Sequence, residues 1–282
     1  MAKRRYSFDE EKISRFLKEG RGQGHGAQYS PWLTVQDVSS LGRATRIHGR
    51  KTGREHHLLS DIETAAFLLF DWSETVIDIR EQYPLDREET RRIATEMGVR
   101  HPFDTQGKCD LVMTTDLLVD VQTSNGLQLH VRSVKPAKEL EDPRTLEKLE
   151  IDRRYWADKS DSWGLITDLD IPKQRVKNLR WLHELFSLAG MEEAYPGYWS
   201  DRCNRFLQCL PNAKGGTIKR FIQQLESTQG FAAGEGLMVL RHLGATKQLL
   251  IDLDQPFTVN APLATLAIAV VPTGTHQTRG VA

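Results

Sequence analysis

The stretches Thr115-Asp-Leu-Leu-Val-Asp120 and Leu127-Gln-Leu-His-Val-Arg-Ser-Val-Lys135 decide the fold of this 282-residue chain. Asp116 opens an apolar run of the kind found in buried strands. The second stretch ends at Lys135, directly before a proline, which lacks the backbone donor of a strand ladder. Ser124-Asn-Gly126 lies between them and is typical of a tight turn. We therefore predict a hairpin of the strands Asp116–Val121 and Leu127–Val134.

The elements around this hairpin alternate between helix and strand. Hydrophobic periodicity predicts two helices and two further strands most clearly. They are the helices Asp61–Trp72 and Arg144–Lys159 and the strands Thr75–Gln82 and Trp163–Thr167. A shorter, exposed helix is expected at Glu88–Met97. This order predicts an α/β fold with a mixed sheet flanked by helices.

The N-terminal region contains two candidate phosphate-binding segments. Ser7-Phe-Asp-Glu10 has the pattern of a capping box and predicts a helix to about Lys18. In the glycine-rich loop that follows, Arg21 and His25 are candidate DNA contacts, with a flexible linker as the alternative. A predicted hairpin, Arg43–His48 with Glu55–Leu59, carries Arg50 and Lys51 at its tip, which either touch DNA or are simply solvated.

The composition changes near residues 168–172, so we expect a domain of residues 1–170 followed by a smaller one of residues 171–273. The second domain is expected to contain four helices and one pair of short strands, at Gln174–Ser187, Asp201–Leu210, Thr217–Leu225 and Gly236–Leu243, and at Leu249–Asp252 with Phe257–Val259. Helices followed by a strand pair are typical of a winged-helix module. Residues 274–282 are expected to be a disordered tail.

The overall composition excludes several classes of protein. The formal net charge is zero, so a nucleic-acid surface would have to be a local patch. There is no apolar run of 18 residues, and we expect a soluble cytoplasmic protein without a leader segment or a membrane contact. The three cysteines lack paired C-x-x-C spacing, which argues against a zinc cluster.

Three residues have the pattern of a metal-dependent nuclease site. Glu63 lies in the first turn of a predicted helix, Asp116 begins one hairpin strand, and Lys135 ends the other. Carboxylates are hard oxygen ligands that suit Mg²⁺, and a lysine can stabilise charge on a phosphate in the transition state. Each residue also has a structural explanation. Ser60-Asp-Ile-Glu63 fits a capping box, Asp116 could be a strand-entry residue, and Lys135 a solvated strand end.

Several co-linear blocks within residues 1–170 resemble the TnsA family, the endonuclease subunits of heteromeric bacterial transposases. The blocks that carry the resemblance are Glu19-Gly-Arg-Gly-Gln-Gly-His-Gly26, Pro31-Trp-Leu-Thr-Val-Gln36, His57-Leu-Leu-Ser-Asp61, Asp78-Ile-Arg-Glu-Gln82, Thr115-Asp-Leu-Leu-Val-Asp120, Val134-Lys-Pro-Ala137, Arg144-Thr-Leu-Glu-Lys-Leu-Glu150 and Arg153-Arg-Tyr-Trp156. The resemblance implies a restriction-endonuclease-like catalytic domain and a winged-helix-like C-terminal domain.

The resemblance also implies the roles of the site residues. Glu63, Asp116 and Lys135 would be catalytic, and two Mg²⁺ ions, replaceable by Mn²⁺, would be bound. Asp116 would bridge the ions, Glu63 would complete one site, and the Val134 carbonyl would contribute to the other. The family has glutamine two residues before the lysine, where this chain has Ser133, a shorter ligand that would reach a metal through water. We therefore expect weaker metal binding and better support from Mn²⁺ than from Mg²⁺.

The implied activity is hydrolysis of double-stranded DNA at the 5′ ends of a transposon. The implied partners are an integrase-like transposase, TnsB, and an AAA+ ATPase regulator, TnsC, which would contact the C-terminal part. Two alternatives stay open at this point. One is a stand-alone restriction or repair nuclease, and the other is a weakly active or inactive assembly subunit that bridges DNA and an ATPase regulator.

Overall fold

The computed structural model describes residues 7–38 and 43–269, and the chain divides into two compact units between Ile171 and Pro172. The expected domain boundary was one residue earlier, and independent folding of the two parts stays a prediction. The expected disordered tail, 274–282, lies outside the described residues. Among the residues that are described, no helix has the length and apolar character needed to cross a membrane.

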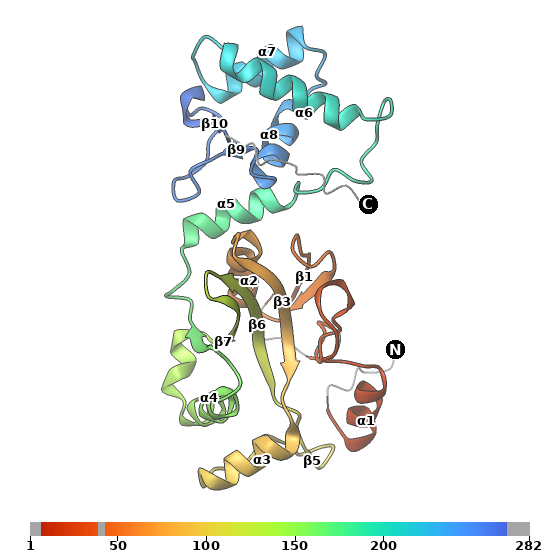
Figure 1. Cartoon of the computed structure of the whole chain (residues 1–282), viewed down its shortest axis with the longest axis vertical. Helices are drawn as coiled ribbons and strands as arrows, with labels where there is room; N and C mark the ends of the chain where they lie inside the picture. Colours follow the sequence, from red (N-terminus) through yellow and green to blue (C-terminus); the bar gives the residue numbers. More distant parts are fainter. Residues whose placement is uncertain (1–6, 39–42, 270–282) are drawn as a thin grey trace, which may run out of the picture. The chain divides into compact units, whose positions relative to one another are not determined.

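The first unit is built on a mixed sheet of four strands in the order β3 (Val76–Pro84), β6 (Thr114–Thr123), β7 (Gly126–Val134) and β8 (Ser162–Ile166). The first three strands, which Figure 1 labels, are antiparallel, and β8 is parallel to β7. The predicted hairpin is confirmed, with Leu117 opposite Arg132 and Thr123 opposite Gly126. The α/β prediction of a mixed sheet flanked by helices is also confirmed.

Two helices cover opposite faces of this sheet. Successive strand residues point to opposite faces, so Leu117 and Leu118 pack into different cores. Leu117 shares a core with Phe67 of α2 (Asp61–Trp72), whereas Leu118 shares one with Trp156 of α4 (Pro143–Trp156). The β6–β7 hairpin is therefore sandwiched between helices, and its polar strand-end residues are placed at the border of the packed core.

Shorter elements complete the first unit. They are α1 (Glu10–Lys18), η1 (Gly26–Gln28), β1 (Thr45–His48), β2 (Glu55–Leu58), α3 (Arg87–Glu96), β4 (Phe103–Asp104), β5 (Cys109–Asp110) and η2 (Ala137–Glu141). The predicted hairpin of β1 and β2 is confirmed. The predicted cap of α1 is wrong in one respect, because Asp9 rather than Ser7 is the N-cap and accepts a hydrogen bond from the Lys12 amide.

The glycine-rich loop between α1 and η1 is an ordered turn, so the flexible-linker alternative is wrong. The Gly22 amide donates to the Ser30 carbonyl at 2.6 Å, and the Gly26 amide donates to Asp78 Oδ2 at 3.1 Å. Gly22 has φ 81°, and a Cβ there would lie 2.1 Å from the Pro84 side chain. Only glycine fits this close approach to β3.

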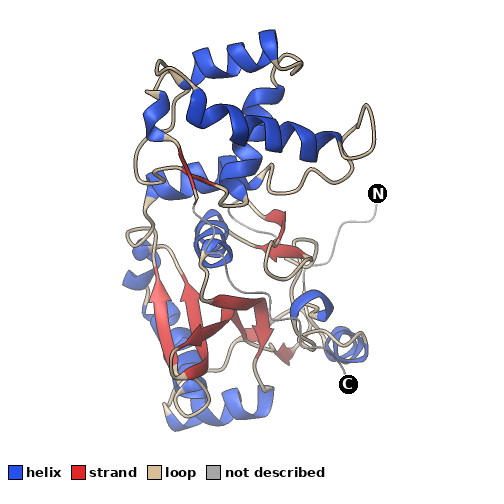
Figure 2. Cartoon of the chain, turned by 45° about the horizontal axis from the view of Figure 1, so that its top comes forward, coloured by secondary structure: helices blue, strands red, loops and turns tan. Residues whose placement is uncertain are grey.

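The second unit consists mainly of helices around one apolar core (Figure 2). Its elements are α5 (Lys173–His183), α6 (Tyr198–Cys209), η3 (Leu210–Asn212), α7 (Ile218–Thr228), α8 (Glu235–Ala245), β9 (Leu249–Leu250), η4 (Leu263–Thr265) and β10 (Ala267–Ile268). The predicted strand pair is wrong in its second member. Leu249 pairs with Ile268, whereas Phe257 stacks on Trp181 with a ring separation of 4.6 Å. The winged-helix comparison stays a prediction.

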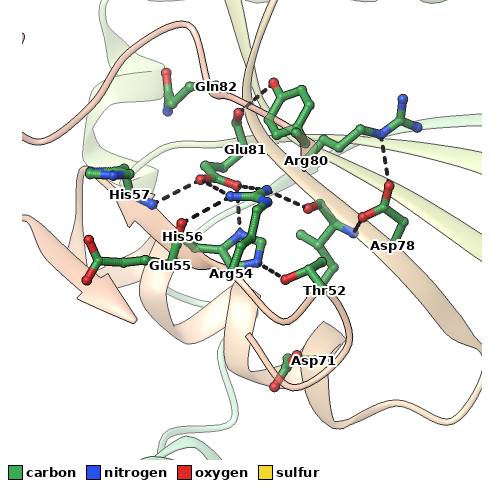
Figure 3. Close-up of polar contacts among 12 residues, drawn as sticks. Thr52, Arg54, Glu55, His56, His57, Asp71, Asp78, Arg80, Glu81 and Gln82 are labelled. Carbon is green, nitrogen blue, oxygen red and sulfur yellow. Dashed lines mark hydrogen bonds and ion pairs between the residues drawn. The ribbon is translucent and has the colours of Figure 1, made fainter. Parts of the chain in front are cut away.

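A buried charged cluster fastens the β1–β2 hairpin to β3 (Figure 3). The fully buried carboxylate of Glu81 accepts two hydrogen bonds from Arg54, at 2.8 and 2.6 Å, and one from the His57 amide. The His56 ring lies 2.7 Å away. Burial raises the pKa of Glu81, but the hydrogen bonds from Arg54 and His56 outweigh it and bring the pKa down to about 2. The Glu81 carboxylate therefore stays ionised at neutral pH.

We expect Glu81→Gln to lower the free energy of unfolding at pH 7 by about 3–5 kcal/mol, because Arg54 is left buried without its counter-charge. A lowered carboxyl pKa stabilises the fold above its ordinary value of 4.5, and this contribution is lost as the pH falls from there towards 2. The difference between variant and wild type should therefore shrink on acidification. Urea unfolding at pH 7 and pH 3 measures it, with Glu88→Gln, an exposed position, as the control. A difference independent of pH would contradict this assignment.

Candidate active site

Asp116 is anchored between the two strands of the central hairpin. It lies near the start of β6, and its Oδ2 accepts the Val134 amide at 2.7 Å and the Lys135 ammonium at 2.9 Å. The residue is 8% exposed. This carboxylate therefore has one oxygen bound to the end of β7, which fixes the orientation of the other.

Lys135 follows β7 and forms the positive part of the site. Its Nζ donates to Asp116 and also to the Val134 carbonyl at 2.9 Å, and 32% of the side chain is exposed. Burial lowers the pKa of Lys135, whereas the charge of Asp116 and its hydrogen bond raise it, and the net result is a raised pKa. The lysine is thus a permanent cation that is still accessible from outside the core.

Glu63 lies in the first turn of α2, as predicted, but its cap contact differs from the expected box. Ser60 Oγ accepts from the Glu63 amide at 3.1 Å, which confirms the N-cap. The Glu63 carboxylate accepts from the Leu59 amide at 3.0 Å, one residue before the expected partner. Burial and the nearby charge of Asp116 raise the pKa of Glu63 to about 7. The capping contact uses Oε2, and neither the cap nor the burial prevents the other oxygen from acting as a ligand.

The two acids are joined by a residue that sequence reasoning missed. The Gln82 amide nitrogen lies 3.2 Å from Glu63 Oε2 and 3.5 Å from Asp116 Oδ1. The structure thus brings Glu63, Asp116 and Lys135 together with the Val134 carbonyl. In the sequence, Gln82 was noted only as the last residue of a predicted strand and of one block that resembles the family, and neither gave it a role in the site.

Ser133 lies beside this group but is engaged elsewhere. A cavity of about 350 Å³ is lined by Asp116, Ser133, Lys135 and the α4 residue Asp152, among others. The Ser133 hydroxyl donates to Asp152 Oδ2 at 2.5 Å and is 3% exposed. This contact argues against the expected ligand role of Ser133. A larger groove of about 830 Å³ runs along α1 and contains none of the predicted catalytic residues.

Asp152 is a second residue that sequence reasoning missed. Its carboxylate also accepts from the Thr115 hydroxyl at 2.5 Å and from the Trp163 indole at 2.8 Å, so it ties α4 to three strands. Burial raises its pKa, although the hydrogen bonds from Ser133, Thr115 and Trp163 act in the opposite direction. In the sequence it is one of many charges on the helix, and only its direction towards the sheet distinguishes it.

The four predicted DNA-contact residues have different environments. The Arg21 guanidinium is bound to Glu19 and Asp37 and packs 3.5 Å from the centre of the Phe16 ring, which argues against a phosphate contact. Arg50 lies over the Trp72 ring at 5.0 Å, and the Lys51 backbone amide donates to an α2 carboxylate. Arg50 and Lys51 are in the turn between β1 and β2, where a DNA contact stays a prediction.

His25, the fourth of these residues, is exposed and lies near two acids. Its Nδ1 is 3.5 Å from Asp78 and 4.0 Å from Asp120, and the three side chains could in principle hold a metal ion. However, the Arg80 guanidinium already pairs with Asp120 at 2.7 Å and lies 3.7 Å from Asp78. This arginine is close to both acids, whereas Lys135 pairs with Asp116 of the Glu63–Asp116 pair, so the His25 cluster is the poorer cation site.

Comparison with known proteins agrees with this fold and site. Residues 73–168 match the family described as TnsA-like endonuclease N terminal, and residues 170–253 match TnsA endonuclease C terminal. The chain is 51% identical to the transposon Tn7 transposition protein TnsA of Escherichia coli over 185 residues. These residues are 66% of this chain and 67% of that protein.

The fold, the cluster of acids and lysine, and these matches define a DNA endonuclease of a transposition system. The chain belongs to the TnsA family, the endonuclease subunits of Tn7-like transposases. These matches argue against the alternative of a stand-alone restriction or repair nuclease.

The raised pKa of Glu63 gives a stability prediction for the metal-free protein. A raised carboxyl pKa stabilises the fold below its ordinary value of 4.5, and this contribution is lost as the pH rises through about 7. We expect Glu63→Gln, measured in chelator, to be more stable than wild type at pH 8 by up to about 3 kcal/mol, and no more stable at pH 4. Urea unfolding monitored by circular dichroism measures this, with the exposed Glu11→Gln as the control. Equal stability at both pH values would show that Glu63 titrates normally.

Proposed function

We propose that this protein is a metal-dependent endonuclease that hydrolyses double-stranded DNA at the 5′ ends of a transposon. The observation that carries the proposal is the convergence of Glu63, Asp116 and Lys135 around one point. The two acids are linked through one amide, and Asp116 is bound directly to the lysine. The relative's name, a Tn7 transposition protein, supports the transposon as the substrate.

The donor set fits a divalent cation. Two carboxylates and the Val134 carbonyl are hard oxygen donors of the kind that Mg²⁺ and Mn²⁺ prefer. Burial raises the pKa of Glu63, and repulsion by the charge of Asp116 raises it further, to about 7. A bound cation would relieve this repulsion, and it would supply Lewis acidity to the scissile phosphate and to an attacking water.

The residues of the site would have separate roles in the reaction. Asp116 would hold the metal with Oδ1, since its Oδ2 is fixed by the Val134 amide and by Lys135. Glu63 would complete the site from α2 after losing its proton. Lys135, cationic and partly exposed, would bind the phosphate and stabilise its growing negative charge. The Val134 carbonyl would be the ligand of a second ion, because the Ser133 hydroxyl is bound to Asp152.

The proposed partners follow from membership of the family. As a subunit of a Tn7-like transposase, the chain would act in the cytoplasm beside TnsB, which would process the 3′ ends, and would be regulated by TnsC. Arg50 and Lys51 at the β1–β2 turn are proposed contacts to the DNA backbone. An inactive assembly subunit is the competing proposal, and the engaged Ser133 hydroxyl is the observation that favours it.

We expect Asp116→Asn to lower the rate of 5′-end cleavage at least about a thousand-fold, with either Mg²⁺ or Mn²⁺. Asparagine can still accept from the Val134 amide, so the fold should survive, but it brings no negative charge to the metal. Cleavage of labelled transposon-end DNA with the partner transposase present measures the rate. Asp158→Asn, an exposed position on the same unit, is the control. Wild-type cutting by a folded Asp116→Asn protein would refute the site, and absent cutting by wild type would favour the assembly subunit.

The two compact units give a prediction about regulation. The candidate catalytic residues all precede Ile171, so we expect a chain that ends there to fold and to keep the metal site. It should lose binding to the ATPase regulator, which we assign to the second unit. Circular dichroism and a pull-down with the regulator, each compared with the full chain, measure the two properties. Retained binding of the regulator by residues 1–171 would overturn the assignment.

A further inference from the structure

Gln82 has an unusual backbone next to the proposed metal site. The residues on either side of it in β3 pair with Leu117 and Thr115, so Gln82 lies across from Asp116. It is 2% exposed and has φ 49°, in the left-handed region. A residue other than glycine is strained in that region, and the conformation persists only where the surrounding structure holds it.

The side chain of Gln82 has one orientation that satisfies all its contacts. Its Oε1 accepts from the Thr114 hydroxyl at 3.0 Å, which turns the amide nitrogen towards the acids. That nitrogen lies 3.2 Å from Glu63 Oε2 and 3.5 Å from Asp116 Oδ1. The two amide hydrogens thus supply one donor for each carboxylate, without adding a charge.

The backbone around Gln82 is held from both sides. Its carbonyl accepts from the Trp32 amide at 3.1 Å. The preceding residue, Glu81, directs its carboxylate into the buried cluster with Arg54 (Figure 3). These contacts keep the left-handed conformation in place. The strained residue is thus the same one whose side-chain amide contacts both acids.

We propose that Gln82 is a positioning residue of the metal-binding pair. Two neighbouring carboxylates repel each other, and in the absence of a cation they would move apart or bind a proton. The Gln82 amide would hold them at a fixed spacing, so that a divalent cation enters a site that is already arranged. This inference rests on the proposed function, because it assumes that Glu63 and Asp116 are metal ligands. Outer partners of ligands typically contribute about 10- to 100-fold to metal affinity.

Substitution of Gln82 by glycine distinguishes the effect of the side-chain amide from that of the backbone conformation. Glycine adopts positive φ without strain, so Gln82→Gly should keep the backbone conformation of β3, yet it lacks the amide. Gln82→Asn keeps an amide and tolerates the same φ, but it is one methylene shorter. We expect both variants to bind Mn²⁺ about 10- to 100-fold more weakly than wild type. Gln122→Asn makes the same change at an exposed position of β6 and should leave the affinity unchanged.

The measurement is calorimetric titration of the full chain with Mn²⁺ alone, at one pH, with urea unfolding of each variant alongside. Thr114→Val provides a second test that leaves Gln82 in place, because it removes only the hydroxyl that orients the amide. We expect it to weaken Mn²⁺ binding in the same direction but less, and this test remains if Gln82→Gly does not fold. Wild-type affinity in Gln82→Gly, or in Thr114→Val if the glycine variant is unfolded, would overturn the proposal.

The same titration of the Asp116→Asn variant distinguishes a failure of this inference from a failure of the proposed function. If Asp116→Asn binds Mn²⁺ and cuts DNA like wild type, the proposed active site is wrong, and the role of Gln82 is wrong with it. If Asp116→Asn loses both while the Gln82 variants bind Mn²⁺ normally, only the role of Gln82 is wrong. A loss of Mn²⁺ affinity in both sets supports both proposals.

Discussion

The electrostatic constraint on this protein is that two carboxylates, Glu63 and Asp116, are buried close together, with Lys135 bound to one of them. Burial and mutual repulsion are already visible in the raised pKa of Glu63. A fold can keep such a pair only if other groups hold it in place, since each acid alone would gain from moving into water. The end of β7 holds Asp116, the start of α2 holds Glu63, and Gln82 lies between them.

The surrounding structure makes this arrangement rigid. On one side, the buried cluster of Glu81 and Arg54 fixes β3 against the β1–β2 hairpin. On the other side, Asp152 of α4 binds hydroxyls and an indole from three strands. In both clusters the acid has its hydrogen-bond partners, and such fully paired networks define one packing of their neighbours. The strands that carry Gln82 and Asp116 are therefore fixed relative to each other before any ligand binds.

Much of the fold could be predicted because its signals are local. The alternating strands, the Asn-Gly turn and the Ser60 cap each act within a few residues, and they placed the hairpin and α2 correctly. The proposed catalytic residues could be named because the co-linear blocks around them resemble the TnsA family, whereas their pattern alone left a structural explanation open for each. The second strand of the C-terminal pair was misplaced because Ala267–Ile268 is a two-residue strand. So short a segment has no periodicity that would distinguish it from its neighbours.

The parts that could not be predicted depend on contacts between distant residues. Gln82 matters because a left-handed backbone and the Thr114 hydroxyl aim its amide at acids 19 and 34 positions away. Asp152 differs from other helix acids only in facing β7. Ser133 is the reverse case, in which a role was expected that the contacts argue against. Its position in the sequence indicated a metal ligand, whereas its hydroxyl is bound to Asp152. A residue's place in a motif fixes where its backbone lies, but its partners across the fold decide which atoms remain available for chemistry.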